Sequence, residues 1–458
     1  MKVAPGSFRD PSGQVFSKDG NIYRTINHSY KDQWELVEPF LQAMVNKGLV
    51  VAFEEVDPLA DSWKTLKVET VSFVSYPYEW SYDQLRDAGL LTLKLQKCAL
   101  QNGLILKDAS AYNVQFIGSK AVFIDHLSFE KWEEGKPWSA YKQFCSHFLA
   151  PLALLSSVDL RCGLFSRLWI DGIPLDVAAA MMPFKKRFNS ALYFHLFLHA
   201  RMQNKYANPE KHTKKVSSIK VTADYLIKLA ESLERLFLSK SMRLSKRLTE
   251  WGDYYNNTNY TSEAANEKET IVAKAAQQYG NGGLALDLGA NTGRYTVQIA
   301  RFFSCVVAAD IDPLAVNRHY LALKSSRQQE NILPLIMDFA NPSPAIGFNN
   351  VERPSFLQRC KADFIIALAL IHHLRITNGI PLSMIAEFFS LLLKQNGILV
   401  LEFVPKEDSQ TQKLLSLRED IFEDYTLENC KEVFSEKLIC LKEIEIKESS
   451  RHILIFKK

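Results

Sequence analysis

Residues 284–302 read LALDLGANTGRYTVQIARF, and this stretch sets the architecture of the C-terminal half. An apolar run ends with Asp287 and Leu288, the turn GANTG follows at 289–293, and apolar residues then recur at helical spacing. Glycines permit a tight turn and leave room for a ligand close to the backbone. A strand, a glycine turn and a helix in this order predict a ligand site at the carboxyl end of a buried strand.

Short apolar runs and helical segments alternate on both sides of this turn. The apolar runs predict strands at 284–288, 305–309, 332–337, 363–369 and 397–403. Helices are expected at 294–303, from Pro313 onward and at 382–394, with a terminal β-hairpin from 439–445 and 452–456. This alternation predicts a Rossmann-like, doubly wound α/β sheet over 250–458.

Two further acids follow expected strand ends. Asp310 lies 17 residues after Gly293, where a carboxylate can accept hydrogen bonds from both hydroxyls of a ribose. Asp338 ends the third strand, a position suited to an adenine amino group. The turn has the form D-x-G-x-N-x-G and lacks the dinucleotide fingerprint G-x-G-x-x-G. An acid in the first strand suits a cofactor with an amino-acid moiety and a sulfonium better than one with a pyrophosphate.

Through these motifs, residues 250–458 resemble the class I S-adenosylmethionine-dependent methyltransferases. The resemblance implies S-adenosylmethionine as the cofactor, with Asp310 at its ribose. It implies that the amino-acid part contacts Asp287, Gly289, Ala290, Asn291 and Gly293, and that the adenine faces Asp338 and Phe339. A purely structural turn is the alternative. Asp312 is expected to cap the helix that Pro313 opens.

The fourth expected strand is followed by His372 and His373, the candidates for a catalytic base toward the methyl acceptor. Neutral imidazole can take a proton from a hydroxyl or an amine, and we rank His373 ahead of His372. Alternatively, both histidines only pack, or transfer needs only the positioning of the two reactants. Four aromatic residues before the sheet either cover the cofactor or pack the entry helix, namely Trp251, Tyr254, Tyr255 and Tyr260.

A second motif, KDASAYNVQFIGSKAVFID, lies at 107–125 in the N-terminal half. Two apolar runs flank a Gly-Ser turn and predict a hairpin from 114–117 and 121–124. Asp108 precedes Asn113 by five residues, and Asp125 ends the second run. This spacing resembles the catalytic loop of protein-kinase-like and aminoglycoside-phosphotransferase-like enzymes. The resemblance implies Asp108 as a base and Asn113 and Asp125 as magnesium ligands in a Mg-ATP site.

The N-terminal half also departs from that family pattern. Leu106 stands where the family has a histidine, and His126 and Leu127 replace the usual phenylalanine and glycine. No glycine-rich loop precedes the motif, and Arg24 is the candidate for the phosphate-holding cation. A degenerate kinase-like module that positions a substrate or partner is as good an interpretation as an active phosphotransferase. An ordinary hairpin with capped turns is the third.

Composition supports a two-domain globular protein. The chain has 458 residues, 47% of them hydrophobic, and a formal charge of +4, which is too small to indicate a nucleic-acid or membrane partner, and we do not expect nucleic acid as a partner. We expect a kinase-like domain at 1–200, a basic connector with a helix at 201–249, and a methyltransferase domain at 250–458. Seven scattered cysteines predict free thiols. No apolar run is long enough to span a membrane, and we expect a cytoplasmic location.

The order of a kinase-like loop followed by a methyltransferase resembles bacterial host-nodulation-specificity methyltransferases, a likeness carried by KDASAYNVQF and VFIDHLSFE. We expect methyl transfer to a small-molecule or glycan-related acceptor by direct attack on the sulfonium methyl, with the N-terminal domain positioning the substrate or a partner. One alternative is a bifunctional phosphotransferase–methyltransferase. The other is a non-catalytic scaffold that senses the cofactor.

Overall fold

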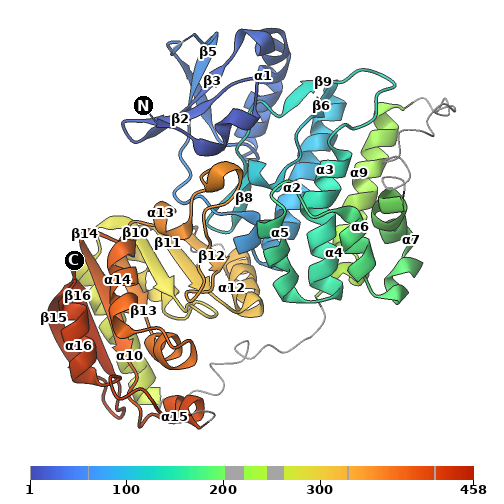
Figure 1. Ribbon diagram of the computed structural model, residues 1–458. Coiled ribbons are helices and arrows are strands. Elements are labelled where there is room, and N and C mark those ends of the chain that lie inside the picture. Colours follow the sequence, from blue (N-terminus) through green and yellow to red (C-terminus); the bar gives the residue numbers. More distant parts are fainter. Residues whose placement is uncertain (1, 60, 202–220, 245–261, 327–329, 417–418) are drawn as a thin grey trace. The chain divides into compact units, whose positions relative to one another are not determined.

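The computed structural model describes residues 2–59, 61–201, 221–244, 262–326, 330–416 and 419–458 (Figure 1). These residues form two compact units, and each is described by itself. The first unit falls within Met1–Phe116, Lys120–Arg247 and Ile346–Arg353. The second falls within Ile117–Ser119, Leu248–Ala345 and Pro354–Lys458.

The second unit is built on a seven-stranded sheet with the order β12-β11-β10-β13-β14-β16-β15. Its strands are β10 (Gly282–Leu288), β11 (Phe303–Asp310), β12 (Ile332–Ile336), β13 (Ala362–Ala367), β14 (Leu393–Phe403), β15 (Ile439–Glu445) and β16 (His452–Lys457). The first five run parallel, and β16 lies antiparallel between β14 and β15. The predicted doubly wound α/β sheet is therefore confirmed, including its terminal hairpin.

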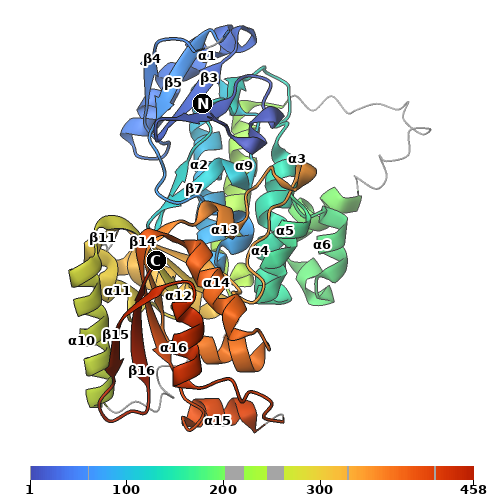
Figure 2. The same ribbon diagram turned by 60° about the vertical axis from the view of Figure 1, so that its left-hand side comes forward.

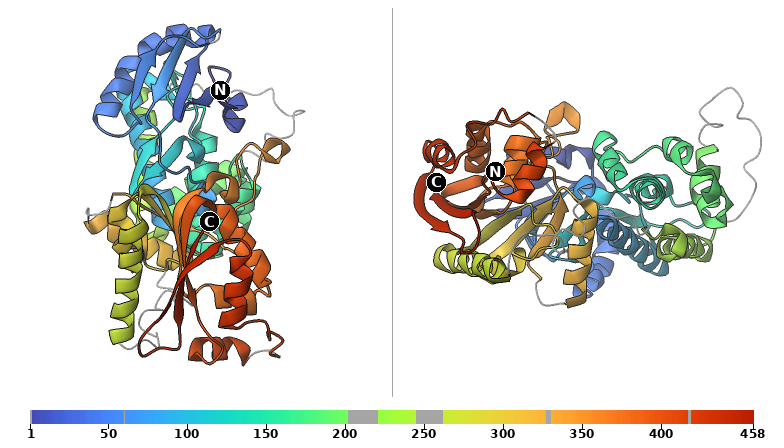
Figure 3. Two further views of the ribbon diagram at one scale, coloured as in Figure 1. Left: turned by 90° about the vertical axis from the view of Figure 1, so that its left-hand side faces the viewer. Right: turned by 90° about the horizontal axis from the view of Figure 1, so that it is seen from below.

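Helices cover both faces of this sheet (Figures 2 and 3). They are α10 (Ser262–Tyr279), α11 (Thr296–Ile299), α12 (Pro313–Ser326), α13 (Phe356–Arg359), α14 (Leu382–Leu392), α15 (Ser409–Leu415) and α16 (Leu427–Ser435). Alternate residues of a strand point to opposite faces. Ile455 of β16 accordingly lies in one apolar cluster with Val272 of α10, whereas the ring of Phe456 stacks on Phe434 of α16 with centroids 5.4 Å apart.

The helix expected at 294–303 is shorter in the structure. It consists of the four-residue α11 followed by a 3-10 turn at Ala300–Phe302. Asn331 ends it, because its side-chain amide donates to the carbonyl oxygens of Ala300 and Phe303, both at 2.8 Å. Phe303 then begins β11 and is 5% exposed.

The first unit begins with a five-stranded antiparallel sheet of order β1-β2-β3-β5-β4, which the sequence analysis did not predict. The strands are β1 (Lys2–Val3), β2 (Val15–Lys18), β3 (Asn21–Ile26), β4 (Phe53–Val56) and β5 (Lys64–Val68). Two short sheets follow, formed by β6 (Leu104–Leu106) with β9 (Phe129–Lys131) and by β7 (Val114–Ile117) with β8 (Lys120–Phe123). The β7–β8 pair is the predicted hairpin.

The rest of the first unit is mainly helical. Its helices are α1 (Lys31–Asn46), α2 (Tyr82–Gln101), α3 (Tyr141–Phe144), α4 (Ala150–Ser157), α5 (Phe165–Leu168), α6 (Leu175–Met181), α7 (Ser190–Leu192) and α9 (Ala223–Leu238). A small β-rich part followed by helices is the layout that the kinase-like resemblance implies, and that resemblance stays a prediction.

Helix α9 lies where the sequence predicts a helix within a connector. The Thr222 hydroxyl caps it by accepting from the Tyr225 backbone N–H at 3.2 Å. Leu226 and Leu233 are buried, and α9 packs against α2, so this helix is part of the first unit. The rest of the connector lies largely outside the described residues, as do Trp251, Tyr254, Tyr255 and Tyr260.

All seven cysteines are free thiols, as predicted. A search of the described helices finds none with the length and apolarity needed to cross a membrane.

Candidate active site

The carboxyl ends of β10, β11 and β12 lie side by side, because the three strands run parallel and in register. Asp287 is opposite Ala308, and Asp310 is opposite Ile336. The turn after β10 is held against β11, since the backbone N–H groups of Gly289 and Ala290 both donate to the Ala309 carbonyl, at 2.9 and 3.1 Å. The structure thus brings the glycine turn and the predicted ribose acid to one edge of the sheet.

The two glycines of this turn are needed for different reasons. Gly289 and Gly293 have φ values of +83° and +84°, a region that strains other residues. A Cβ on Gly293 would lie 2.1 Å from Nε2 of the buried His319. A Cβ on Gly289 would meet its nearest heavy atoms at 3.8 Å. Packing therefore excludes a side chain at Gly293, whereas at Gly289 the constraint is the backbone conformation and the access of a ligand.

Asp310 organises the turn through its carboxylate. Oδ2 accepts from the Asn291 backbone N–H at 2.8 Å, and Oδ1 accepts from that of Asp312 at 2.8 Å. Burial nevertheless raises the Asp310 pKa to about 6, although these backbone hydrogen bonds lower it. Its charge is only partly compensated, and each oxygen has a further lone pair for a ligand hydroxyl. Asp312 accepts from the backbone N–H of Leu314 at 2.8 Å, which confirms its predicted capping role.

Asp287 is the more strongly perturbed acid, and it is 2% exposed. Its Oδ2 accepts from the Thr296 hydroxyl at 2.5 Å. Burial raises the Asp287 pKa to about 7, the Thr296 hydrogen bond lowers it, the Asp310 charge raises it, and Lys268 lowers it. Two buried carboxylates at the ends of adjacent strands repel each other, so cationic and hydroxyl partners are needed to stabilise them. These residues therefore fit a cofactor that carries an ammonium group and a ribose.

A buried ionic network lies beside these acids. Lys268 of α10 donates to Glu402 of β14 at 2.6 Å, and its Nζ lies 4.6 Å from the centroid of the Tyr295 ring. Glu402 also pairs with Arg451 at 3.4 Å, and Arg451 Nε reaches Asp408 at 2.8 Å. Burial lowers the Lys268 pKa, which Glu402 counteracts. The network places one cation, Lys268, close enough to Asp287 to influence its titration.

The sequence analysis did not identify this network or Thr296. For two members of the network, the sequence does contain a signal, namely a charged residue in apolar surroundings. Glu402 is the one acid in the apolar run ILVLEF, and Lys268 occupies the buried stripe of α10 that contains Ala264 and Val272. Arg451 gives no such signal, because its partners come from other elements.

The predicted adenine residues lie at the end of β12. Asp338 is half-buried and its Oδ1 accepts from the Ala340 backbone N–H at 2.9 Å. Phe339 is 8% exposed and packs against Phe356 and Phe388, with ring centroids 6.3 and 6.4 Å away. Phe339 is therefore part of an aromatic core, and its role toward adenine stays a prediction.

His372 and His373 follow β13, with ring centroids 4.2 Å apart. Burial lowers the His373 pKa to about 4. Burial, together with the charges of His373, Arg451 and Lys268, lowers the His372 pKa well below its usual range. Both rings are therefore neutral at pH 7, as the base hypothesis requires. They are weak bases, however, because holding the proton here is unfavourable.

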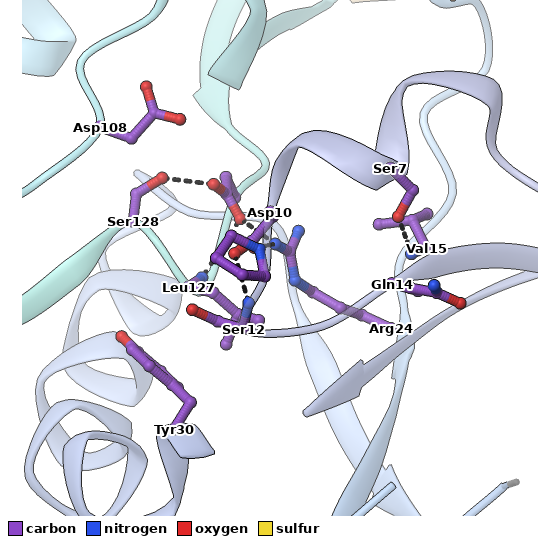
Figure 4. A network of polar contacts seen from close by, with 12 residues as sticks. Ser7, Asp10, Ser12, Gln14, Val15, Arg24, Tyr30, Asp108, Leu127 and Ser128 are labelled. Carbon is purple, nitrogen blue, oxygen red and sulfur yellow. Dashed lines mark hydrogen bonds and ion pairs between the residues drawn. The ribbon is translucent and has the colours of Figure 1, made fainter. Parts of the chain in front are cut away.

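The first unit brings Asp108, Asn113 and Asp125 together, but in a different arrangement from the predicted one. Arg24 of β3 forms an ion pair with Asp10 at 2.5 Å (Figure 4). It also forms an ion pair with Asp125 at 2.6 Å. Asp125 also accepts from the Ser128 hydroxyl and from the Leu127 backbone N–H at 3.2 Å. Burial would raise the Asp125 pKa, but Arg24 and these hydrogen bonds outweigh it, and the pKa is lowered.

These residues do not fit the expected magnesium site. The Asn113 amide donates to Ser128 Oγ at 3.1 Å and to the Asp108 carbonyl at 3.4 Å. Both Asp125 oxygens already have donors, and one of these donors is the Arg24 guanidinium, with which a metal ion at Asp125 would have to compete. Over the described parts of the chain, no group of three His, Cys, Asp or Glu side chains could hold a metal ion. Burial and the Asp125 charge raise the Asp108 pKa.

Comparison with solved structures finds methyltransferases. The N-methyltransferase NodS from Bradyrhizobium japonicum WM9 covers 43% of this chain and 97% of its own, with 14% identity and a TM-score of 0.32. The magnesium protoporphyrin IX methyltransferase ChlM from Synechocystis PCC 6803 covers 45% of this chain and 92% of its own, with 15% identity and a TM-score of 0.32.

No protein-family model matches the chain. Nodulation protein NoeA from Rhizobium meliloti (strain 1021) is 32% identical over 461 residues, which span 99% of this chain and 95% of that protein. The likeness therefore includes both units, and it confirms the predicted kinship with nodulation proteins. The chain belongs to the family of nodulation protein NoeA.

Proposed function

We propose that the second unit is an S-adenosylmethionine-dependent methyltransferase whose acceptor is a small-molecule or glycan-related compound. The observation that carries the proposal is the pair of buried, incompletely compensated carboxyls, Asp287 and Asp310, at adjacent strand ends beside a glycine turn. A buried acid without a full partner is unfavourable unless a ligand completes the site. The strand order and the position of the turn agree with this function.

Each proposed cofactor residue has a separate task. Asp310 accepts from ribose hydroxyls while it holds Asn291 and Asp312 through their backbone N–H groups. Asp287 attracts the ammonium group and is oriented by Thr296. The turn presents its backbone to the cofactor at Gly289, Ala290, Asn291 and Gly293. When bound, the cofactor supplies an electrophilic methyl group.

The acceptor side depends mainly on positioning. A nucleophile held in line with the sulfonium needs little further assistance. His373 is the candidate base, ahead of His372, for an acceptor that must lose a proton. Its pKa of about 4 suits an acceptor whose proton leaves only as the new bond forms. We assign the acceptor to the small-molecule or glycan-related class, and the first unit to positioning a substrate or a partner.

The alternative of a metal-dependent phosphotransferase is not favoured, because the Asp125 carboxylate already forms an ion pair with the Arg24 guanidinium. A scaffold that senses the cofactor would bind it as the enzyme does but would not transfer its methyl group. One experiment distinguishes the enzyme from the scaffold. S-adenosylmethionine with a labelled methyl group is incubated with the full chain and a metabolite extract, and labelled product and S-adenosylhomocysteine are measured.

We expect calorimetric binding of S-adenosylhomocysteine and acceptor-dependent turnover. Asp310→Ala should weaken binding by about ten- to a hundredfold and lower turnover at subsaturating cofactor to match. Binding without turnover in any extract would favour the sensor, and absence of binding would refute the cofactor assignment.

A further inference from the structure

One turn at the surface of the first unit has an inverted polarity. This FKKRF turn is the 3-10 turn Phe184–Phe188, which lies between α6 and α7 (Figure 1). Phe184 and Phe188 are 68% and 77% exposed. Lys186 lies between them, is half-buried, and donates through Nζ to the Ser241 backbone carbonyl at 2.5 Å. The apolar side chains are therefore exposed while a lysine is turned inward, the reverse of the usual surface in water.

Neighbouring contacts hold the FKKRF turn in this conformation. The Asn189 side chain donates to Ser241 Oγ at 3.0 Å and accepts from the Leu192 backbone N–H at 2.8 Å. The Phe184 and Phe188 rings pack edge to face, with centroids 5.6 Å apart, and both stay exposed. Burial lowers the Lys186 pKa, so keeping this cation inside is itself unfavourable. Exposure of the two rings is thus a property of the folded turn.

Exposed cations surround the two rings. Lys185 and Arg187 belong to the same turn, and Lys240 precedes the serine that anchors it. Arg187 Cζ lies 5.6 Å from the centroid of the Phe184 ring. Among the described residues, no carboxylate forms an ion pair with any of these three cations. The sequence has no Asp or Glu from 177 to 201, so this surface is locally positive although the whole chain carries only +4.

A second pair of exposed phenylalanines in the first unit lacks this charge. Phe8 and Phe348 are 57% and 74% exposed and also pack edge to face, with centroids 5.9 Å apart. The cation beside them, Arg9, pairs with Glu352 at 2.5 Å and with Asp171 at 2.7 Å. Exposed rings next to unpaired cations therefore distinguish the FKKRF turn from the other pair.

This combination matches the boundary of an anionic lipid bilayer, where apolar side chains enter the acyl region and cations stay at the phosphates. A second copy of the chain suits it less, because a twofold contact would bring like charges together. Nucleic acid also suits it less, because the two rings are inclined by 85° and offer no parallel faces to successive bases. We propose that the FKKRF turn binds the surface of anionic phospholipid membranes, with Phe184 and Phe188 inserted and Lys185 and Arg187 at the headgroups.

Co-sedimentation of the full chain with lipid vesicles tests the proposal. One set of vesicles contains phosphatidylcholine alone, and the other contains equal parts of phosphatidylcholine and phosphatidylglycerol. We expect the chain to sediment with the anionic vesicles and much less with the neutral ones. Added salt should weaken binding, because it screens the cations from the lipid phosphates.

Two variants locate the binding surface. Phe188→Ser should weaken binding to anionic vesicles about tenfold, because an apolar side chain is lost from the bound state. Phe348→Ser is its matched control, since Phe348 is as exposed but lies in the pair whose cation is neutralised. Lys185→Glu should weaken binding by a similar factor, whereas Lys94→Glu, at an exposed position of α2, should not. Thermal unfolding followed by circular dichroism should be unchanged in all four variants.

Four outcomes would overturn the proposal. Two are failure to sediment with anionic vesicles and equal binding to neutral ones. The others are binding that Phe188→Ser leaves unchanged and binding that Lys185→Glu leaves unchanged. If vesicles do not bind, sedimentation velocity and titration with single-stranded DNA show whether the turn instead serves a second copy or a nucleic acid. None of these measurements involves S-adenosylmethionine, so failure here is distinguishable from failure of the proposed methyltransferase.

Discussion

Asp310 links two functions in one side chain, since its carboxylate holds the turn and is also the proposed acceptor for ribose hydroxyls. Asp310→Ala should weaken S-adenosylhomocysteine binding by about 1.5–3 kcal/mol, because hydrogen bonds to a charged acceptor are lost. Isothermal titration calorimetry measures the effect. Asp363→Ala is the matched control. Asp363 also accepts from a backbone N–H of this sheet, that of Leu284 at 2.9 Å, but it lies in the amino-terminal half of β13, away from the carboxyl ends of the strands.

If Asp363→Ala weakens binding as much as Asp310→Ala does, the effect reflects general loss of sheet stability. In that case a residue other than Asp310 would bind the ribose hydroxyls.

The raised pKa values of Asp287 and Asp310, about 7 and about 6, make cofactor affinity dependent on pH. Ligand hydroxyl and ammonium groups need the ionised carboxylates, so binding releases protons wherever the free protein is protonated. Affinity should therefore be full above pH 7.5 and fall by about ten- to a hundredfold by pH 5.5. Titrations over this range, with Asp287→Asn as a comparison, measure the dependence.

The Asp287→Asn profile should be flatter, because one titrating group is removed. The free protein should show the opposite trend in stability. Carboxyls with raised pKa values bind more protons in the folded state, so the free energy of unfolding falls as pH rises from about 4 to 7. An affinity that does not change between pH 7.5 and 5.5 would contradict the assignment of both acids.

At the scale of elements, α10 and β14 are joined by the buried pair of Lys268 and Glu402. Lys268→Met should destabilise the second unit by about 3 kcal/mol, because it leaves a buried carboxylate with only the longer contact to Arg451. Urea denaturation followed by circular dichroism measures the change. Lys431→Met is the control, since Lys431 pairs with Glu443 at the exposed surface and its loss should have little effect.

The double variant Lys268→Met/Glu402→Leu separates the two possible causes. If the unpaired charge causes the loss, replacing Glu402 as well should recover much of the stability. A double variant that is less stable than the single one would instead indicate that packing at α10 is responsible.

Sequence patterns predicted the elements of the second unit because its strands are short, continuous apolar runs. The runs around 284–288 and 397–403 are buried on both faces, and such strands stand out from their surroundings. The N-terminal sheet was missed because its strands are short and partly exposed, as Phe53–Val56 is. Its residues carry no long apolar run and no regular alternation.

The site was predictable to the extent that it is local. Asp287, Gly289 and Gly293 belong to one turn, and Asp310 follows the next strand. The ion pair of Arg24 with Asp125 was not predictable, because it joins residues far apart in the chain and depends on how β3 meets the loop after β8. That contact determines whether the N-terminal motif can hold a metal, so the spacing of Asp108, Asn113 and Asp125 was insufficient evidence for one.

At the scale of the whole molecule, each unit buries an apolar core of its own. Trp34 and Phe148 are fully buried in the first unit, as are Leu286 and Phe364 in the second. Nodulation protein NoeA, a relative of this chain, is similar over both units. The proposed cofactor site lies within the second unit, because Asp287, Asp310 and the turn between them all belong to it.

This organisation predicts two unfolding transitions in differential scanning calorimetry, one for each unit. S-adenosylhomocysteine at a hundred times its dissociation constant should stabilise the second unit by about 2.7 kcal/mol and raise only that transition. The transition of the first unit should not move, because the proposed cofactor site is not part of it. Asp310→Ala should reduce the response of the second unit, because the variant weakens binding at the proposed cofactor site. A single transition that S-adenosylhomocysteine shifts as a whole would mean instead that the units unfold cooperatively, and that binding at the cofactor site stabilises the whole chain.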